Sequence, residues 1–218
     1  MKTFKAFGVA SKNYQTKETA YGDTYTARDN SHPSTPLVMP LNPYNSEIII
    51  AEAILEIGSG VGRNLKWIME NTSAHYYGIE PNESMRRFFW DYQDKKWEPR
   101  VTLVPTFEQL PIDLKADVVV VTFTFQHIGF MTPDDVFNVT DITKEAMKYT
   151  KSDAVWIMYE HDFEDNWIDR WKQECNIHFA VYERLYPFEH LNHRGNHHLI
   201  IFKQNTNPIT NAISSVLE

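Results

Sequence analysis

The chain has 218 residues, of which 42% are hydrophobic, and a formal net charge of −8. This length and composition suffice for one α/β domain with a substantial core. The acidic balance argues against an extended nucleic-acid-binding face, and the single cysteine, Cys175, excludes an intrachain disulfide and a cysteine-rich zinc site. We expect a cytoplasmic protein without a membrane anchor, because the N-terminal residues hold no long apolar segment and one cysteine suits a reducing compartment.

The two ends of the chain differ in composition from its centre. Residues 21–45 are rich in Asn, Asp, Ser, Thr and Pro, which predicts irregular chain rather than a helix or a strand. The last residues are polar and include Pro208, which predicts a loosely held tail. We therefore expect an irregular N-terminal extension over residues 1–46, a folded domain over residues 47–203 and a flexible tail over residues 204–218.

The most informative stretch is ILEIGSGVGRNL, residues 54–65. Its apolar run is interrupted by Glu56. Three glycines then follow at alternate positions: Gly58, Gly60 and Gly62. Because a helical pattern begins directly afterwards, this order predicts a buried strand, a glycine turn and a helix N-terminus, which suits a nucleotide-like cofactor. The spacing differs from the G-x-G-x-x-G pattern of dinucleotide-binding folds. A tight turn without a ligand is the alternative interpretation.

Strand and helix patterns alternate along the rest of the chain. Further strands are predicted at residues 75–80, 101–104, 116–125 and 153–160. Helices are predicted after residues 64, 82 and 132 and over residues 166–174. The apolar runs at 178–188 and 197–203 are separated by a loop too short for a crossover helix, so they are expected to form an antiparallel hairpin. These elements predict an α/β fold whose sheet is mostly parallel, with helices on both faces.

With an acid two residues before the first glycine, the chain resembles the class I S-adenosylmethionine-dependent methyltransferases. The resemblance covers residues 47–203 and implies a Rossmann-like, doubly wound sheet of seven strands, five parallel and closed by the antiparallel pair. It implies S-adenosylmethionine as the cofactor, with Glu56 near the methionine amino group and the three glycines under the ribose and methionine. A charge argument agrees, because a Glu that ends a hydrophobic strand is costly unless paired, and this cofactor carries an ammonium group but no phosphate.

Four further cofactor positions follow from the resemblance. Glu80 ends the second strand, where a carboxylate can accept hydrogen bonds from both ribose hydroxyls; the alternative is a surface glutamate before a turn. Thr106 stands where many family members carry an adenine-binding Asp, and Phe107 beside it can stack on the adenine ring or face it with its backbone N–H. Thr122 is expected beside the methionine, at the end of the fourth strand.

Methyl transfer from a sulfonium is an in-line displacement, so much of its rate can come from positioning. A general base is needed where the acceptor must lose a proton. His127, after the fourth strand, is the first candidate because histidine titrates near neutral pH; a structural histidine is the alternative. Glu160 and His161 end the fifth strand and are expected at the rim of the same pocket, as bases or as hydrogen-bonding partners.

Four histidines crowd the loop of the final hairpin: His190, His193, His197 and His198. Their spacing differs from the helical H-E-x-x-H pattern, so we expect no metal site and favour an acceptor-facing loop or an ordinary turn. In small methyltransferases of this class the N-terminal extension often covers the cofactor, which is what the resemblance implies for residues 1–46.

The leading functional hypothesis is a methyltransferase acting on a small-molecule acceptor at nitrogen or oxygen, with neither nucleic acid nor a membrane as partner. A peptide or protein acceptor is the first alternative. The second is a non-catalytic module that binds S-adenosylmethionine on the same fold. The third, a dehydrogenase, fits the glycine spacing poorly. The oligomeric state is left open by the sequence.

Overall fold

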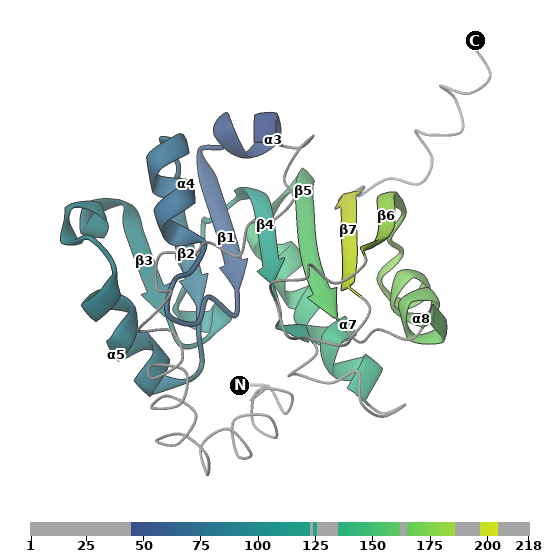
Figure 1. Ribbon diagram of the computed structural model, residues 1–218. Helices are drawn as coiled ribbons and strands as arrows, with labels where there is room; N and C mark the ends of the chain where they lie inside the picture. The colour runs from purple at the N-terminus through teal and green to yellow at the C-terminus, as the bar shows by residue number, and fades with distance from the viewer. Residues whose placement is uncertain (1–44, 123, 126–134, 162–164, 186–196, 205–218) are drawn as a thin grey trace.

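The computed structural model describes residues 45–122, 124–125, 135–161, 165–185 and 197–204, which are drawn as coloured ribbon in Figure 1. Most of the expected N-terminal extension and of the expected tail lie outside these residues. In the described ranges, no helix combines the length and the apolar composition that crossing a membrane requires.

The centre of the molecule is a mixed β-sheet in the order β3-β2-β1-β4-β5-β7-β6 (Figure 1). The strands are β1 (Ala53–Ile57), β2 (His75–Ile79), β3 (Val101–Val104), β4 (Ala116–Thr122), β5 (Thr150–His161), β6 (Phe179–Leu185) and β7 (His197–Lys203). The pairs β1–β2, β1–β4, β2–β3 and β4–β5 are parallel. The pairs β5–β7 and β6–β7 are antiparallel. The prediction of a mostly parallel sheet with an antiparallel C-terminal pair is confirmed.

The predicted end of the fourth strand is wrong, and the fifth strand begins earlier than predicted, at Thr150 rather than at residue 153. The β-branched and aromatic run over residues 116–125 predicts ten residues of strand, but β4 ends at Thr122. The strand stops because the backbone N–H groups of Thr124 and Phe125 donate to the side chain of Glu160 rather than to a neighbouring strand. This contact is not local in sequence, so the run of residues alone could not reveal it.

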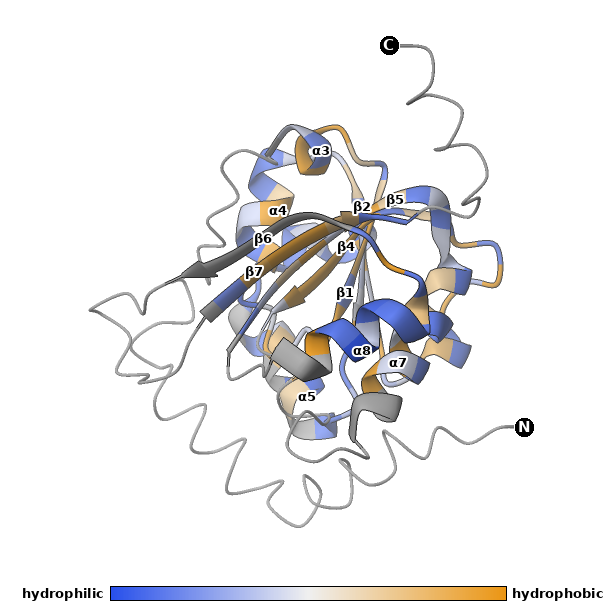
Figure 2. Ribbon diagram, turned by 90° about the vertical axis from the view of Figure 1, so that its right-hand side faces the viewer, coloured by the Kyte–Doolittle hydropathy of each residue, from blue (hydrophilic) through white to orange (hydrophobic). Residues whose placement is uncertain are grey.

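Helices cover both faces of the sheet. The α-helices are α3 (Asn45–Ile49), α4 (Leu65–Asn71), α5 (Glu83–Tyr92), α7 (Asp135–Ala146) and α8 (Asp165–Cys175). Short 3-10 helices are η1 (Lys95–Arg100), η2 (Phe107–Gln109) and η3 (Met147–Tyr149). Asn82 caps α5 as predicted, because its side chain accepts a hydrogen bond from the backbone N–H of Met85. Figure 2 shows α7 and α8 on one side of the sheet and α4 on the other.

Strand alternation sends successive side chains of β1 into two separate cores. Leu55 and Ile57 lie in the core under α7 and α8, where Trp171 is fully buried. Ile54 lies in the opposite core with Ile68 of α4. These two apolar layers hold the central strands in register and therefore fix where their carboxyl ends meet.

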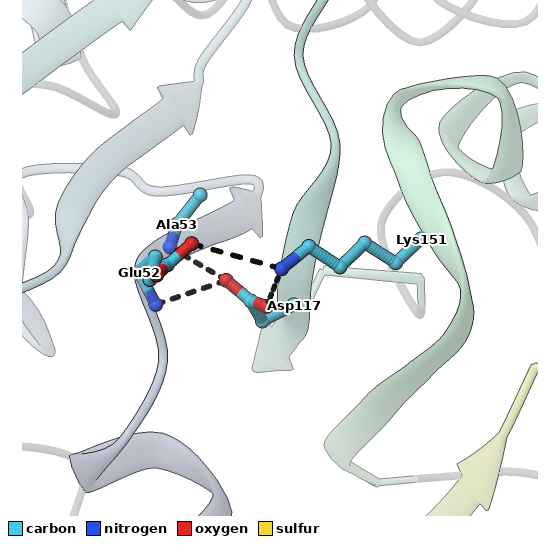
Figure 3. A network of polar contacts seen from close by, with 4 residues as sticks. All are labelled: Glu52, Ala53, Asp117 and Lys151. Atoms are coloured by element: carbon cyan, nitrogen blue, oxygen red, sulfur yellow. Dashed lines mark hydrogen bonds and ion pairs between the residues drawn. The ribbon is translucent and has the colours of Figure 1, made fainter.

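The amino ends of three strands are tied together by one carboxylate (Figure 3). Oδ2 of Asp117 in β4 accepts the backbone N–H groups of Glu52, at 2.9 Å, and Ala53, at 2.8 Å. Oδ1 of the same side chain pairs with the ammonium group of Lys151 in β5. That ammonium group also lies 3.8 Å from a carboxylate oxygen of Glu52. Because these contacts lie at the starts of β1, β4 and β5, they leave the carboxyl ends of the strands to the candidate site.

Candidate functional site

The glycine turn after β1 depends on backbone conformations that only glycine adopts readily. Gly58, Gly60 and Gly62 have φ values of +73°, +54° and +81°. The backbone N–H groups of Gly58 and Ser59 donate to the carbonyl oxygen of Ile79, at 2.8 and 3.0 Å. The turn is therefore fastened to the carboxyl end of β2 and leads directly into α4.

The three glycines differ in what surrounds them. A Cβ atom at Gly58 would lie 2.3 Å from Oγ1 of Thr124, and one at Gly62 would lie 2.6 Å from the ring of Phe89. A Cβ atom at Gly60 would meet no atom of the described chain within 4 Å. Gly58 and Gly62 are thus required for close packing of the protein on itself, whereas Gly60 borders open space in which a ligand can approach the backbone.

Glu56 is buried at the end of β1, with 1% of its surface exposed. Its Oε1 accepts a hydrogen bond of 2.6 Å from the side-chain amide of Asn64, and its Oε2 accepts one from the hydroxyl of Tyr76. Burial raises the pKa of Glu56 to about 7, and the charge of Glu80 adds to this rise, while the two hydrogen bonds oppose it. The carboxyl group is therefore held in place, and it titrates near neutral pH.

Glu80 follows β2 and is also buried, with 8% of its surface exposed, so it is not the surface glutamate of the alternative interpretation. Its two oxygens accept the backbone N–H groups of Gly60, at 2.9 Å, and Asn82, at 2.8 Å. Desolvation raises the pKa of Glu80 to about 7, against the effect of these two hydrogen bonds. Arg86 donates to the carbonyl oxygen of Glu80 at 2.6 Å and so fixes the turn that carries the carboxylate.

Asn64 links the ends of β1 and β4. Its side-chain amide donates to Glu56 and also to Oγ1 of Thr122, at 3.0 Å. Although Asn64 occupies the cap position of α4, its side chain makes no capping hydrogen bond there. The structure thus brings the predicted residues Glu56 and Thr122 together through a residue that the sequence analysis did not single out.

The two predicted adenine residues lie after β3, one strand further from the centre of the sheet. Thr106 is half-buried and directly precedes η2. Phe107 is fully buried, and its ring stacks on that of Tyr149 with centroids 5.9 Å apart. Because the ring of Phe107 belongs to the core, it does not face open space where an adenine could stack on it.

The three predicted catalytic residues differ in what the structure says of them. His127 lies outside the described residues, and so does the side chain of His161, whose backbone ends β5. Glu160 is fully buried. Its Oε1 accepts the backbone N–H groups of Thr124, at 2.8 Å, and Phe125, at 3.0 Å. A carboxylate in this setting positions the segment after β4.

Thr124 connects that segment to the glycine turn. Its hydroxyl lies 3.1 Å from the carbonyl oxygen of Ile57 and 3.0 Å from that of Thr122, while its backbone N–H donates to Glu160. The ends of β5, β4 and β1 are therefore joined through one residue. The sequence carries a weak signal for it, since Thr124 is a polar residue between two phenylalanines at the end of a β-branched run.

Of the four hairpin histidines, His198 is described and is fully buried in β7, opposite Glu160 in β5. His190 and His193 lie outside the described residues, as does the side chain of His197.

Residues 55–158, which contain all but the last part of this site, match the family described as "Methyltransferase domain". Over these residues the chain is similar to methyltransferase domains. The resemblance to the class I S-adenosylmethionine-dependent methyltransferases, drawn from the glycine motif, is confirmed. A sequence search of curated proteins gives no match.

Solved structures of methyltransferases have the same fold as this chain. The 1,6-didemethyltoxoflavin-N1-methyltransferase of Burkholderia thailandensis, solved with its substrate and S-adenosylhomocysteine, is 12% identical, with a TM-score of 0.63 over 94% of this chain and 92% of that chain. A methyltransferase of Aquifex aeolicus is 15% identical, with a TM-score of 0.55 over 76% of this chain and 89% of that chain. A chain from the Haloferax volcanii complex of the Trm112 activator with a methyltransferase is 13% identical, with a TM-score of 0.55 over 85% and 96%.

Proposed function

We propose that the methyltransferase domain binds S-adenosylmethionine at the glycine turn and transfers its methyl group to a nitrogen or oxygen atom of a small molecule. The observation that carries the cofactor assignment is the pair of buried carboxylates, Glu56 at the end of β1 and Glu80 after the adjacent β2, next to the glycine turn, where Glu80 accepts the backbone N–H of Gly60. Such a pair repels a pyrophosphate but can accept hydrogen bonds from an ammonium group and from ribose hydroxyls.

Each residue of the turn then has a separate role. Glu56 faces the ammonium group of the methionine, and Glu80 accepts from the ribose hydroxyls in exchange for part of its present bonding to the turn. Gly60 allows the ligand to approach the backbone, while Gly58 and Gly62 shape the turn. Thr122 lies beside the methionine, where Asn64 already holds it next to Glu56.

The adenine end rests on fewer contacts. Thr106 can offer a hydroxyl from the turn after β3, and Phe107 can contribute its backbone rather than its buried ring. A hydroxyl in place of a carboxylate makes a weaker hydrogen bond to an adenine amino group. We therefore place most of the binding free energy at the methionine and ribose ends.

When bound, the cofactor supplies a methyl group on a sulfonium, and the chain binds and orients it. Positioning of the acceptor falls to the carboxyl ends of β4 and β5. His127 is proposed as the group that takes a proton from the acceptor, with His161 as second candidate. Glu160 positions the backbone of Thr124 and Phe125, which follow β4, by accepting their N–H groups.

Two observations favour a small acceptor. The net charge of −8 disfavours a polyanionic nucleic acid, and the Burkholderia thailandensis neighbour, which covers 94% of this chain, is a 1,6-didemethyltoxoflavin-N1-methyltransferase. A peptide or protein acceptor is the alternative. Because a single cysteine suits a reducing compartment, we propose that the protein acts in the cytoplasm.

The test has two stages. Isothermal titration with S-adenosylmethionine, S-adenosylhomocysteine and NAD should show binding of the first two only. Release of S-adenosylhomocysteine is then measured with panels of small amines and hydroxyl compounds, of peptides and of whole protein extracts. Binding of NAD alone, or of none of the three, contradicts the cofactor assignment. Cofactor binding without turnover on any panel would favour a non-catalytic module.

A further inference from the structure

We propose that Tyr76 is a positioning residue of the cofactor site, which orients the carboxylate of Glu56 and keeps it charged for the ammonium group of the ligand. The inference rests on the function proposed above and assigns a role to a residue outside the glycine motif.

The contact joins two neighbouring strands. Tyr76 lies in β2, where it pairs with Ile54 of β1, and Glu56 lies two residues further along β1 on the same face. The hydroxyl of Tyr76 donates to Oε2 of Glu56, while Asn64 donates to Oε1 from the start of α4. The carboxylate is therefore held from two sides by groups on two different elements.

The missing side chain at Gly78 leaves room for the ring of Tyr76 to extend to Glu56. Gly78 pairs with Glu56, and a Cβ atom at Gly78 would lie 2.9 Å from Cε1 of Tyr76. On the other side, the ring of Phe89 lies with its centroid 6.3 Å from that of Tyr76. A phenylalanine at position 76 would satisfy this packing equally well. The hydroxyl, which is costly to bury without a partner, is thus explained by Glu56.

The charges around Glu56 give the contact a function. In the described part of the chain, the groups that act on its charge are two neutral donors, Tyr76 and Asn64, and a second carboxylate, Glu80. Burial raises the pKa of Tyr76 well above its ordinary value, so its hydroxyl keeps its proton and always donates. Removing this donor should raise the pKa of Glu56 above about 7 and leave less of it ionised at neutral pH.

The experiment measures binding of S-adenosylhomocysteine by isothermal titration to the parent, Tyr76→Phe and Tyr77→Phe, at one pH below and one above the pKa of Glu56. Tyr77→Phe is the matched control, because it removes a hydroxyl from the next residue of β2, whose side chain packs in the opposite core. We expect Tyr76→Phe to weaken binding about tenfold at about pH 6, and by less at about pH 8, where ionisation recovers. The control should stay within about twofold of the parent at both pH values.

A double-mutant cycle separates this role from packing. In a Glu56→Gln background the added Tyr76→Phe substitution should cost no further affinity, and the pH dependence should be lost with the carboxylate. An equal loss in both backgrounds, a loss that is the same at both pH values, or no loss relative to Tyr77→Phe would overturn the inference. If the parent itself fails to bind S-adenosylhomocysteine, the proposed function fails with it; if the parent binds and Tyr76→Phe matches its control, only this inference fails. Thermal unfolding of each variant confirms that it is folded.

Discussion

Oε2 of Glu80 accepts the backbone N–H of Gly60 at 2.9 Å, so the residue proposed to hold the ribose also holds the turn proposed to lie beside it. The other oxygen of Glu80 accepts the backbone N–H of Asn82, at the cap of α5. One carboxylate thus serves two N–H donors that face it from different elements, and this geometry sets what its substitutions can do.

We predict that Glu80→Gln weakens binding of S-adenosylhomocysteine by about 1–3 kcal/mol and also lowers stability. A glutamine places its NH2 group against either Gly60 or Asn82, both of which are donors. Isothermal titration and thermal unfolding measure the two effects, with the exposed Glu83→Gln in the first turn of α5 as control. Equal affinity of Glu80→Gln and the control would contradict the ribose assignment.

The glycine turn predicts different outcomes for two alanine substitutions. Gly58→Ala should destabilise the fold, because its Cβ would lie 2.3 Å from Oγ1 of Thr124. Gly60→Ala meets no described atom within 4 Å, so it should cost only the strain of a positive φ, about 1–2 kcal/mol. The same Gly60→Ala should nevertheless reduce cofactor affinity about tenfold, because its Cβ enters the proposed ligand space. Thermal unfolding and titration on both variants check this; a stable, fully binding Gly58→Ala would refute it.

The buried carboxyls predict an unusual pH dependence of stability. The pKa of Glu56 is about 7 in the folded protein, above its ordinary value of 4.5. A raised acid pKa means that the folded state binds the proton more tightly, so the free energy of unfolding should fall as pH rises from about 5 to about 7. The slope from this group is at most about 1.4 kcal/mol per pH unit. Urea unfolding across this range should show a shallower slope for Glu56→Gln, and an unchanged slope would contradict the assignment.

Asp117, at the amino end of β4, predicts a pH dependence of stability with the opposite sign. Partial burial acts to raise the pKa of Asp117, but the hydrogen bonds from Lys151 and from the backbone of Ala53 and Glu52 outweigh it and lower the pKa. Asp117 therefore adds to the free energy of unfolding above its ordinary pKa of 3.8, and this stabilisation is lost as pH falls through the lowered pKa. Asp117→Asn should lose about 1–2 kcal/mol of stability at neutral pH.

Two further measurements define that prediction. The difference in free energy of unfolding between Asp117→Asn and the parent should disappear at acid pH. Cofactor affinity should stay unchanged, because Asp117 lies at the starts of the strands. Asp91→Asn, on the exposed face of α5, is the matched control. A deficit that persists in acid would mean that the charge of Asp117 is not what stabilises the strands.

Turnover of Glu160 variants should separate positioning from proton transfer. Glu160→Gln keeps an oxygen that can accept the backbone N–H groups of Thr124 and Phe125, so it should retain most of the methyl transfer rate. His127→Ala should lower turnover while leaving cofactor affinity nearly unchanged. S-adenosylhomocysteine release with an acceptor identified from the panels measures both. A Glu160→Gln variant that is as inactive as His127→Ala would make Glu160 a base.

The sequence predicts the elements well where a local pattern determines them. The strand over residues 101–104 and the cap at Asn82 are found where expected, because strand propensity and capping act within a few residues. The strand over residues 116–125 is overextended, because its end is set by Glu160, far along the chain. The same reason applies to Phe107: its residue type permits stacking on a ligand, and only the packing of Tyr149 shows that the ring lies in the core.

In the candidate site, too, the residues of the local motif are predicted and those that depend on strand pairing are not. The motif predicts Glu56 and Glu80 as neighbours of the turn, and both lie there, buried at the ends of adjacent strands. Tyr76, Asn64 and Thr124 are missed, because their contacts depend on which strands are adjacent and on their register. Register is a property of the assembled sheet. A tyrosine two residues before the glycine that pairs with Glu56 is recognisable only once β1 and β2 are aligned.

Thr124 also bears on how this protein could acquire a different acceptor. Its hydroxyl contacts the carbonyl oxygen of Ile57, its Oγ1 limits position 58 to glycine, and its backbone N–H rests on Glu160. Substitutions that displace Thr124 in order to admit a new acceptor would also displace the glycine turn, which we propose as the binding site of the methyl donor. Changes in acceptor range should therefore accumulate at positions that leave Thr124 in place, and directed evolution for a larger acceptor should first select those.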